Sequence, residues 1–178
     1  MKIRIHKDLR ETVDFVRTVQ AAGVDFITIH GRTRSMRSSE LVILEGVKLV
    51  AEHITVPKLS NGDVFTLADA RSHTEITGVD GVMSARGLLE NPALFKGFEG
   101  CPWEAVEVFM NKVVKAPIPF KLVVHHLSEM VGSDRMTGTV GGGPGTLMTK
   151  EERMQLMDCG SMLELMDWLD DVREVRRL

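Results

Sequence analysis

Residues 23–32 read GVDFITIHGR, and this stretch decides how the rest of the sequence is interpreted. Valine, isoleucine and phenylalanine favour extended backbone, so residues 24–30 are predicted to form a strand. The glycine before it is typical of the residue that ends a helix, and residues 9–22 repeat valine at helical spacing. A polar, arginine-rich loop is expected over 31–40. The stretch therefore predicts a helix, a buried strand and a polar loop at the carboxyl end of that strand.

The same order recurs along the first hundred residues. Further strands are predicted at 3–5, 55–60 and 82–84, and further helices at 41–53 and 66–74. Strands that alternate with helices predict an α/β fold with parallel strands and right-handed crossovers. In such folds the functional residues gather at the carboxyl ends of the strands.

The character of the sequence changes after residue 97. Helices are predicted at 103–115, 120–131, 149–159 and 162–177, so we expect domains at 1–97 and 98–178. Glycine is frequent between the second and third of these helices, and residues 132–148 are predicted to form a flexible insert. The core of the helical domain is expected to contain Phe109, Leu122, Leu127, Leu163, Met166 and Leu169.

Composition excludes several classes of protein. The chain has 178 residues and a net charge of −3, which argues against a globally basic nucleic-acid binder. Residues 1–37 nevertheless contain eight basic and four acidic side chains, which allows a local basic surface. Two cysteines without a CxxC motif suggest a reducing compartment. No apolar run approaches the roughly 18 residues of a membrane span, and no signal peptide is recognised, so a cytoplasmic or nuclear location is expected.

Two turns could bind an anion. Residues 61–63 (NGD) and 85–87 (ARG) follow consecutive strands. Glycine lets backbone N–H groups approach a phosphate, and arginine adds a charged two-pronged donor. The alternative is a pair of ordinary turns. His30 could likewise bind a ligand or only cap the sheet, and Lys2 could face a ligand or solvent.

Other reactive side chains are weaker candidates. His125 and His126 lie beside Glu129 on a predicted helix, but a metal site needs three or four ligands, so packing is favoured and no metal is expected. Nothing near Cys101 in the sequence would lower the pKa of its thiol, so it is not a candidate nucleophile.

Several short motifs in order resemble the tRNA-dihydrouridine synthase family. They are KIR at 2–4, IHGRT at 29–33, NGD at 61–63, VMSARG at 82–87 and NPALF at 91–95. The second half adds PFK at 119–121, HHL at 125–127 and DWLD at 167–170. Together they are most similar to the fourth eukaryotic class of the family.

The resemblance implies a TIM barrel that binds FMN, followed by a helical domain that binds tRNA. Residues 1–97 would then be the C-terminal half of a (β/α)8 barrel. The implied activity is that of an oxidoreductase: NADPH reduces FMN, and a D-loop uridine of tRNA becomes 5,6-dihydrouridine. The family motifs assign cofactor binding to Lys2, His30, Asn61, Gly62, Asp63, Ala85 and Arg86.

Contacts to tRNA phosphates are expected from Arg32, Arg34 and Arg37 in the loop after the second strand, and from Lys121 in the helical part. The alternative for Arg32 and Arg34 is that they brace the rim of the sheet by pairing with Glu40 or Asp63.

The sequence also departs from the family pattern. The family's proton-donating cysteine belongs to the first half of the barrel, and this chain begins at the strand that would be the fifth. We therefore assign no catalytic residue, interpret the chain as a truncated form, and expect it to be inactive alone. A non-catalytic tRNA-binding fragment and another phosphate-binding TIM-barrel enzyme remain as alternatives, and no oligomeric state is predicted.

Overall fold

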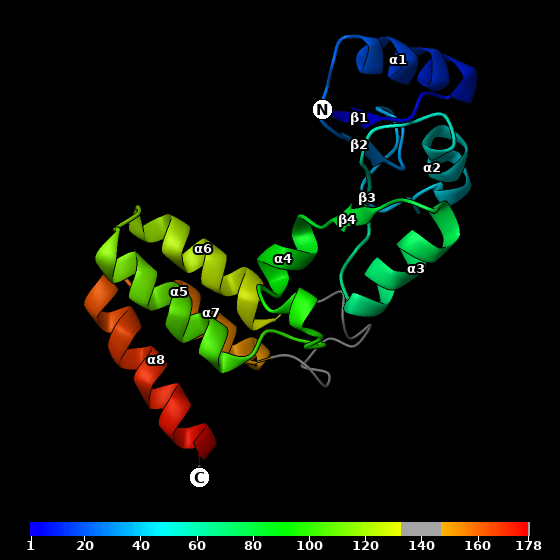
Figure 1. The fold of residues 1–178 in the computed structure, drawn as a ribbon. Coiled ribbons are helices and arrows are strands. Elements are labelled where there is room, and N and C mark those ends of the chain that lie inside the picture. The colour runs from blue at the N-terminus through cyan, green and yellow to red at the C-terminus, as the bar shows by residue number, and fades with distance from the viewer. Residues whose placement is uncertain (133–146, 178) are drawn as a thin grey trace. The chain divides into compact units, whose positions relative to one another are not determined.

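A computed structural model describes residues 1–132 and 147–177. The chain divides into two compact units, Met1–Leu88 and Leu89–Leu178 (Figure 1). This division falls ahead of the boundary expected at residue 97. Apart from its first residue and its last two, the insert predicted at 132–148 lies outside the described residues.

The first unit contains a four-stranded parallel sheet, which confirms the predicted α/β class (Figure 1). Its strands, in spatial and sequence order, are β1 (Lys2–Arg4), β2 (Ile27–His30), β3 (Lys58–Asn61) and β4 (Gly81–Met83). The connecting helices are α1 (Leu9–Ala21), α2 (Leu44–Ala51) and α3 (Leu67–Thr77). A short helix that was not predicted, α4 (Arg86–Glu90), follows β4.

Strand register sorts the side chains onto two faces. On one face, one row pairs Lys2, Thr28, Leu59 and Gly81, and the row two residues further along pairs Arg4, His30, Asn61 and Met83. Residues paired across parallel strands share a face, so the polar side chains collect on one side of the sheet. The other face packs its isoleucines against the helices, in a core formed by Ile3, Ile29, Val13, Val16, Val47 and Val50.

The helix ends have local causes. Asp8 accepts a hydrogen bond from the Arg10 backbone N–H (3.0 Å) and thereby caps α1. Thr66 caps α3 in a capping box with Asp69, as its position in the sequence predicted. The start of α2 was predicted three residues too early. The Ile43 N–H donates to the carbonyl of Gly31 (2.7 Å), and this tertiary contact holds residue 43 outside the helix.

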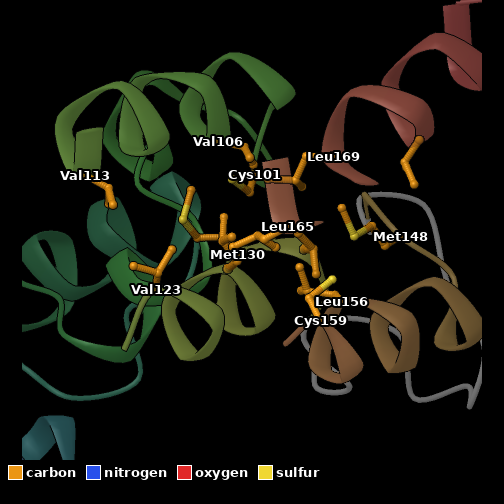
Figure 2. Close-up of a cluster of buried hydrophobic side chains, with 13 residues drawn as sticks. Cys101, Val106, Val113, Val123, Met130, Met148, Leu156, Cys159, Leu165 and Leu169 are labelled. Atoms are coloured by element: carbon orange, nitrogen blue, oxygen red, sulfur yellow. The ribbon is translucent and has the colours of Figure 1, made fainter. Parts of the chain in front are cut away.

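The described part of the second unit contains helices and no strand. After the short 3-10 helix η1 (Leu94–Lys96) come α5 (Trp103–Lys115), α6 (Phe120–Val131), α7 (Lys150–Asp158) and α8 (Met162–Arg177). Thr149 and Glu152 form the predicted capping box of α7. The helices enclose an aliphatic and sulfur-rich core in which Val123, Leu127, Leu156 and Leu165 are fully buried (Figure 2).

The core prediction for this unit was correct for some residues and wrong for others. Leu127 and Leu169 are buried, and Phe109 packs partly against the core. Leu122 and Leu163, however, are 47% and 70% exposed, and Met166 is also exposed. On α8 the buried positions are Leu165, Leu169 and Val172, so the apolar stripe is rotated relative to the predicted one.

Candidate functional site

A cavity of about 160 Å³ opens at the carboxyl ends of the strands in the first unit. Parallel strands bring their carboxyl ends to one edge, so residues far apart in the sequence meet there. All seven residues that the motifs assigned to cofactor binding line this cavity: Lys2, His30, Asn61, Gly62, Asp63, Ala85 and Arg86.

The turn after β3 is held tightly from both sides. The Asn61 side-chain nitrogen donates to the carbonyl of Met83 (2.7 Å) and ties β3 to β4. Gly62 has a φ of 117°, and a Cβ there would lie 2.4 Å from Cγ1 of Val42. Asp63, with a φ of 51°, adopts the left-handed region. The turn therefore requires glycine at position 62.

The carboxylate of Asp63 joins two arginines. Its Oδ1 accepts from Nη2 of Arg86 at 2.9 Å, and its Oδ2 accepts from Nη2 of Arg32. The Arg86 guanidinium also lies over the ring of Phe65, 5.2 Å from its centroid. Arg86 is 33% exposed and lines the cavity, whereas Arg32 is 3% exposed and does not line it.

The position of Arg32 differs from the one expected of an RNA contact. Its Nε donates to the carbonyl of Glu40 (2.5 Å), and its Nη2 is paired with Asp63. The guanidinium is therefore enclosed by protein, as in the bracing alternative, and we remove Arg32 from the candidate RNA contacts. Arg34 and Arg37 are exposed on the same loop, and Lys121 is exposed on α6 of the other unit.

His30 is a neutral hydrogen-bond donor in this site. Its Nδ1 accepts from the backbone N–H of Arg32 (3.1 Å), which leaves the proton on Nε2. Burial lowers the pKa of His30 to about 4, and the neighbouring charges of Arg4, Lys2 and Arg32 act in the same direction, against an opposing effect of Asp63. At neutral pH the ring is therefore uncharged.

Arg4 also lines the cavity and was not identified from the sequence. Its guanidinium donates to the carbonyl of Thr33 (2.8 Å). The signal was present in the KIR motif, since alternate residues of a strand share a face and Arg4 therefore lies on the same face as Lys2.

The lining is cationic overall. Lys2, Arg4 and Arg86 line the cavity together with a single carboxylate, Asp63, which is also paired with Arg32 from outside the cavity. A phosphate group carries up to two negative charges and accepts several hydrogen bonds, so the donors and the charge of this cavity suit a phosphate ester.

The remaining candidates have structural roles in the described residues. The ring of His126 packs against the rings of Phe109 and His125, with 5.7 Å between the ring centroids in each pair. Cys101 is buried, and burial raises the pKa of its thiol to about 12. The residues the structure describes contain no cluster of three His, Cys, Asp or Glu side chains suited to a metal ion. None of their helices is both long and apolar enough to cross a bilayer.

A parallel α/β fold with a cationic cavity at the carboxyl edge of its sheet defines an α/β protein with a site suited to an anionic ligand. The sequence model of one family, dihydrouridine synthase (Dus), matches residues 1–139. The chain belongs to the dihydrouridine synthase family.

Curated relatives agree with this assignment. A tRNA-dihydrouridine(20a/20b) synthase of Saccharomyces cerevisiae is 40% identical over 180 residues, which covers 99% of this chain and 46% of the relative. A protein of the same name from Schizosaccharomyces pombe is 41% identical, covering 99% of this chain and 50% of the relative. A human tRNA-dihydrouridine(20a/20b) synthase-like protein is 40% identical over 74% of this chain and 41% of its own length. The chain spans about half the length of these relatives.

Proposed function

We propose that this chain carries the phosphate-binding part of the FMN site of a tRNA-dihydrouridine synthase. The activity would be the NADPH-driven reduction of a D-loop uridine to dihydrouridine. The relatives' names supply the reaction, the tRNA substrate and NAD(P)+ as the redox partner. The observation that carries the proposal is the meeting of seven separately predicted residues at one cationic cavity.

The two units fit the two parts of such an enzyme. Four parallel strands in sequence order, with helices between them, are what the second half of a (β/α)8 barrel would contain. The helical unit would be the tRNA-binding domain. Arg34, Arg37 and Lys121 are exposed and would contact phosphates of the RNA. A cytoplasmic or nuclear location would suit this substrate.

The residues of the cavity fit the phosphate end of FMN. When bound, FMN supplies hydride transfer between the nicotinamide and the uracil ring. Arg86, Lys2 and Arg4 would neutralise the phosphate, and the glycine at position 62 lets the loop after β2 pack against the turn. The Nε2–H of His30 would donate to an acceptor atom of the ligand.

A binding role without turnover is the alternative that one observation favours. Both cysteines are buried, and burial raises the pKa of each thiol. A buried thiol does not reach a substrate, so neither cysteine of this chain is suited to donate a proton to uracil. The chain would then bind FMN or tRNA and form no dihydrouridine.

The test is a titration of the chain with FMN, followed by flavin fluorescence. A charge-assisted contact contributes about 1.5–3 kcal/mol, so Arg86→Ala should weaken FMN binding by roughly 10- to 100-fold. Arg71→Ala removes an exposed arginine of α3 in the same unit and should leave the affinity unchanged. Equal affinities for the parent and Arg86→Ala would exclude the proposed phosphate site. Dihydrouridine formed from tRNA and NADPH separates an enzyme from the binding alternative.

A further inference from the structure

Arg32 holds three parts of the site together without lining the cavity. Its backbone N–H donates to Nδ1 of His30 at 3.1 Å. Its Nε donates to the carbonyl of Glu40 at 2.5 Å, and its Nη2 pairs with Oδ2 of Asp63. One residue is thus bonded to the histidine of the site, to the far end of the polar loop and to the turn after β3.

Burying this guanidinium is costly. Its side chain is 3% exposed, and the hydration that a buried charge loses must be offset by its bonds to protein partners. The bonds of Arg32 to Glu40 and Asp63 must therefore offset the cost of burying its charge.

The hydrogen bonds of Asp63 show how Arg32 affects Arg86 in the ligand site. Arg32 occupies Oδ2, so Arg86 is bonded to Oδ1 through one nitrogen, Nη2. A guanidinium has five N–H donors, and a carboxylate with both oxygens available tends to engage two of them in a fork. With Oδ2 shared with Arg32, Arg86 is bonded to Asp63 through Nη2 alone, and its other N–H groups are left for a phosphate.

We propose that Arg32 is the positioning residue of this site, which sets the orientation of Arg86 through Asp63 and the tautomer of His30 through its own backbone. This inference rests on the proposed FMN site for its first half. Its second half concerns the protein without ligand.

The test for Arg86 is a double-mutant cycle on FMN affinity. Arg32→Lys keeps the positive charge, but an ammonium group is a single point of attachment and cannot hold Glu40 and Asp63 in the same geometry. We expect it to weaken FMN binding by about tenfold in the parent. In the Arg86→Ala background the same substitution should have less than about a twofold effect, because the residue through which it acts is gone.

The test for His30 needs no ligand. In 15N NMR spectra of histidine-labelled protein, the His30 signals are assigned by their loss in His30→Gln. The parent should show a single tautomer with the proton on Nε2. Arg32→Lys keeps the backbone N–H but loses the side-chain bonds to Glu40 and Asp63 that hold it against Nδ1, so it should show a mixture of tautomers. A residue that only stabilises the fold would lower the melting temperature without changing this signature.

A second variant covers the case in which Arg32→Lys does not fold. Arg32→Leu with Asp63→Asn removes the buried ion pair as a unit, which proteins often tolerate. It should also weaken FMN binding and mix the His30 tautomers, with circular dichroism confirming the fold.

The outcomes separate the two proposals. Additive losses in the cycle, or affinity and tautomer unchanged in both Arg32 variants, would overturn the positioning role. A parent chain that does not bind FMN, with a His30 tautomer that still responds to Arg32→Lys, would overturn the proposed function and retain the positioning of His30.

Discussion

A methyl group at position 62 would touch a valine from a loop twenty residues earlier in the sequence. The distance from such a Cβ to Cγ1 of Val42 would be 2.4 Å, and the φ of Gly62, 117°, is one that L-residues rarely adopt. The small size of this one residue lets the loop after β2 approach the turn after β3. That approach places Arg32 within reach of Asp63.

Gly62→Ala should therefore lower the free energy of unfolding by about 2–4 kcal/mol, because backbone strain and a steric clash add. The matched control is Gly23→Ala. Its φ of 83° is also positive, but nothing lies within 4 Å of the added Cβ, so it should cost about 1 kcal/mol. Urea denaturation measures both losses. Equal losses would show that the contact with Val42 is not restrictive.

The protonation of His30 makes stability depend on pH. The pKa of His30 is lowered to about 4 in the folded protein, whereas an unfolded histidine titrates near 6.5. Between these values the unfolded chain binds the extra proton, so stability rises with pH and is lost as the pH falls from about 6.5 to 4.

Between pH 7 and 4.5, the free energy of unfolding of the parent should therefore fall by roughly 1–2 kcal/mol more than that of His30→Gln. This value is smaller than the full pKa difference would give, because the ring is partly exposed to solvent. Urea denaturation at several pH values measures it. Parallel pH profiles for the parent and His30→Gln would show that the ring is not held neutral.

At the level of elements, the helices of the second unit show how apolar periodicity can indicate a helix and still misplace its buried face. Leu122 and Leu127 both lie on α6 within the predicted apolar pattern. Leu127 is fully buried, while Leu122 is 47% exposed. Five residues separate them, which is well over one turn, so they project in different directions.

Leu127→Ala should cost about 2–5 kcal/mol of stability, since it leaves a cavity in the core of the helical unit. Leu122→Ala, the same substitution on the same helix, should cost under about 1 kcal/mol. The two variants are compared by thermal denaturation with circular dichroism. A larger loss of stability in Leu122→Ala than in Leu127→Ala would show that α6 buries the face that contains Leu122.

Over the whole molecule, net charge and local charge have opposite signs. The chain carries −3, yet three cations and one carboxylate line the cavity of the first unit. The exposed Arg34 and Arg37 lie on the loop that follows β2, a few residues after His30, which lines this cavity. An acidic total therefore does not exclude an RNA partner that meets only the basic surface.

If Arg34 and Arg37 contact tRNA phosphates, each alanine substitution should reduce the slope of log affinity against log salt by about 0.7–0.9. Binding of unmodified tRNA is measured at several salt concentrations. Arg71→Ala, which removes an arginine of α3, serves as the reference for loss of net charge. Slopes equal to that of the parent would remove both residues from the interface.

Much of the fold and of the site could be predicted from sequence. Strand and helix patterns depend on residues within a few positions of one another, and they located all four strands and the long helices. The NGD and ARG turns follow consecutive parallel strands, so the proximity of Asp63 and Arg86 followed from topology. Arg4 could have been identified by the same alternation that places Lys2 on the polar face of the sheet.

Only the tertiary structure decided the positions of Arg32, the His30 proton and the buried face of α8. Arg32 pairs with a carboxylate 31 residues away, and its neighbours in the sequence are the same whether it is buried or solvated. The proton of His30 depends on which N–H reaches Nδ1. The face of α8 depends on which helices pack against it. Each of these outcomes is set by contacts between distant parts of the chain, and local sequence patterns do not decide which of several possible partners a side chain will meet.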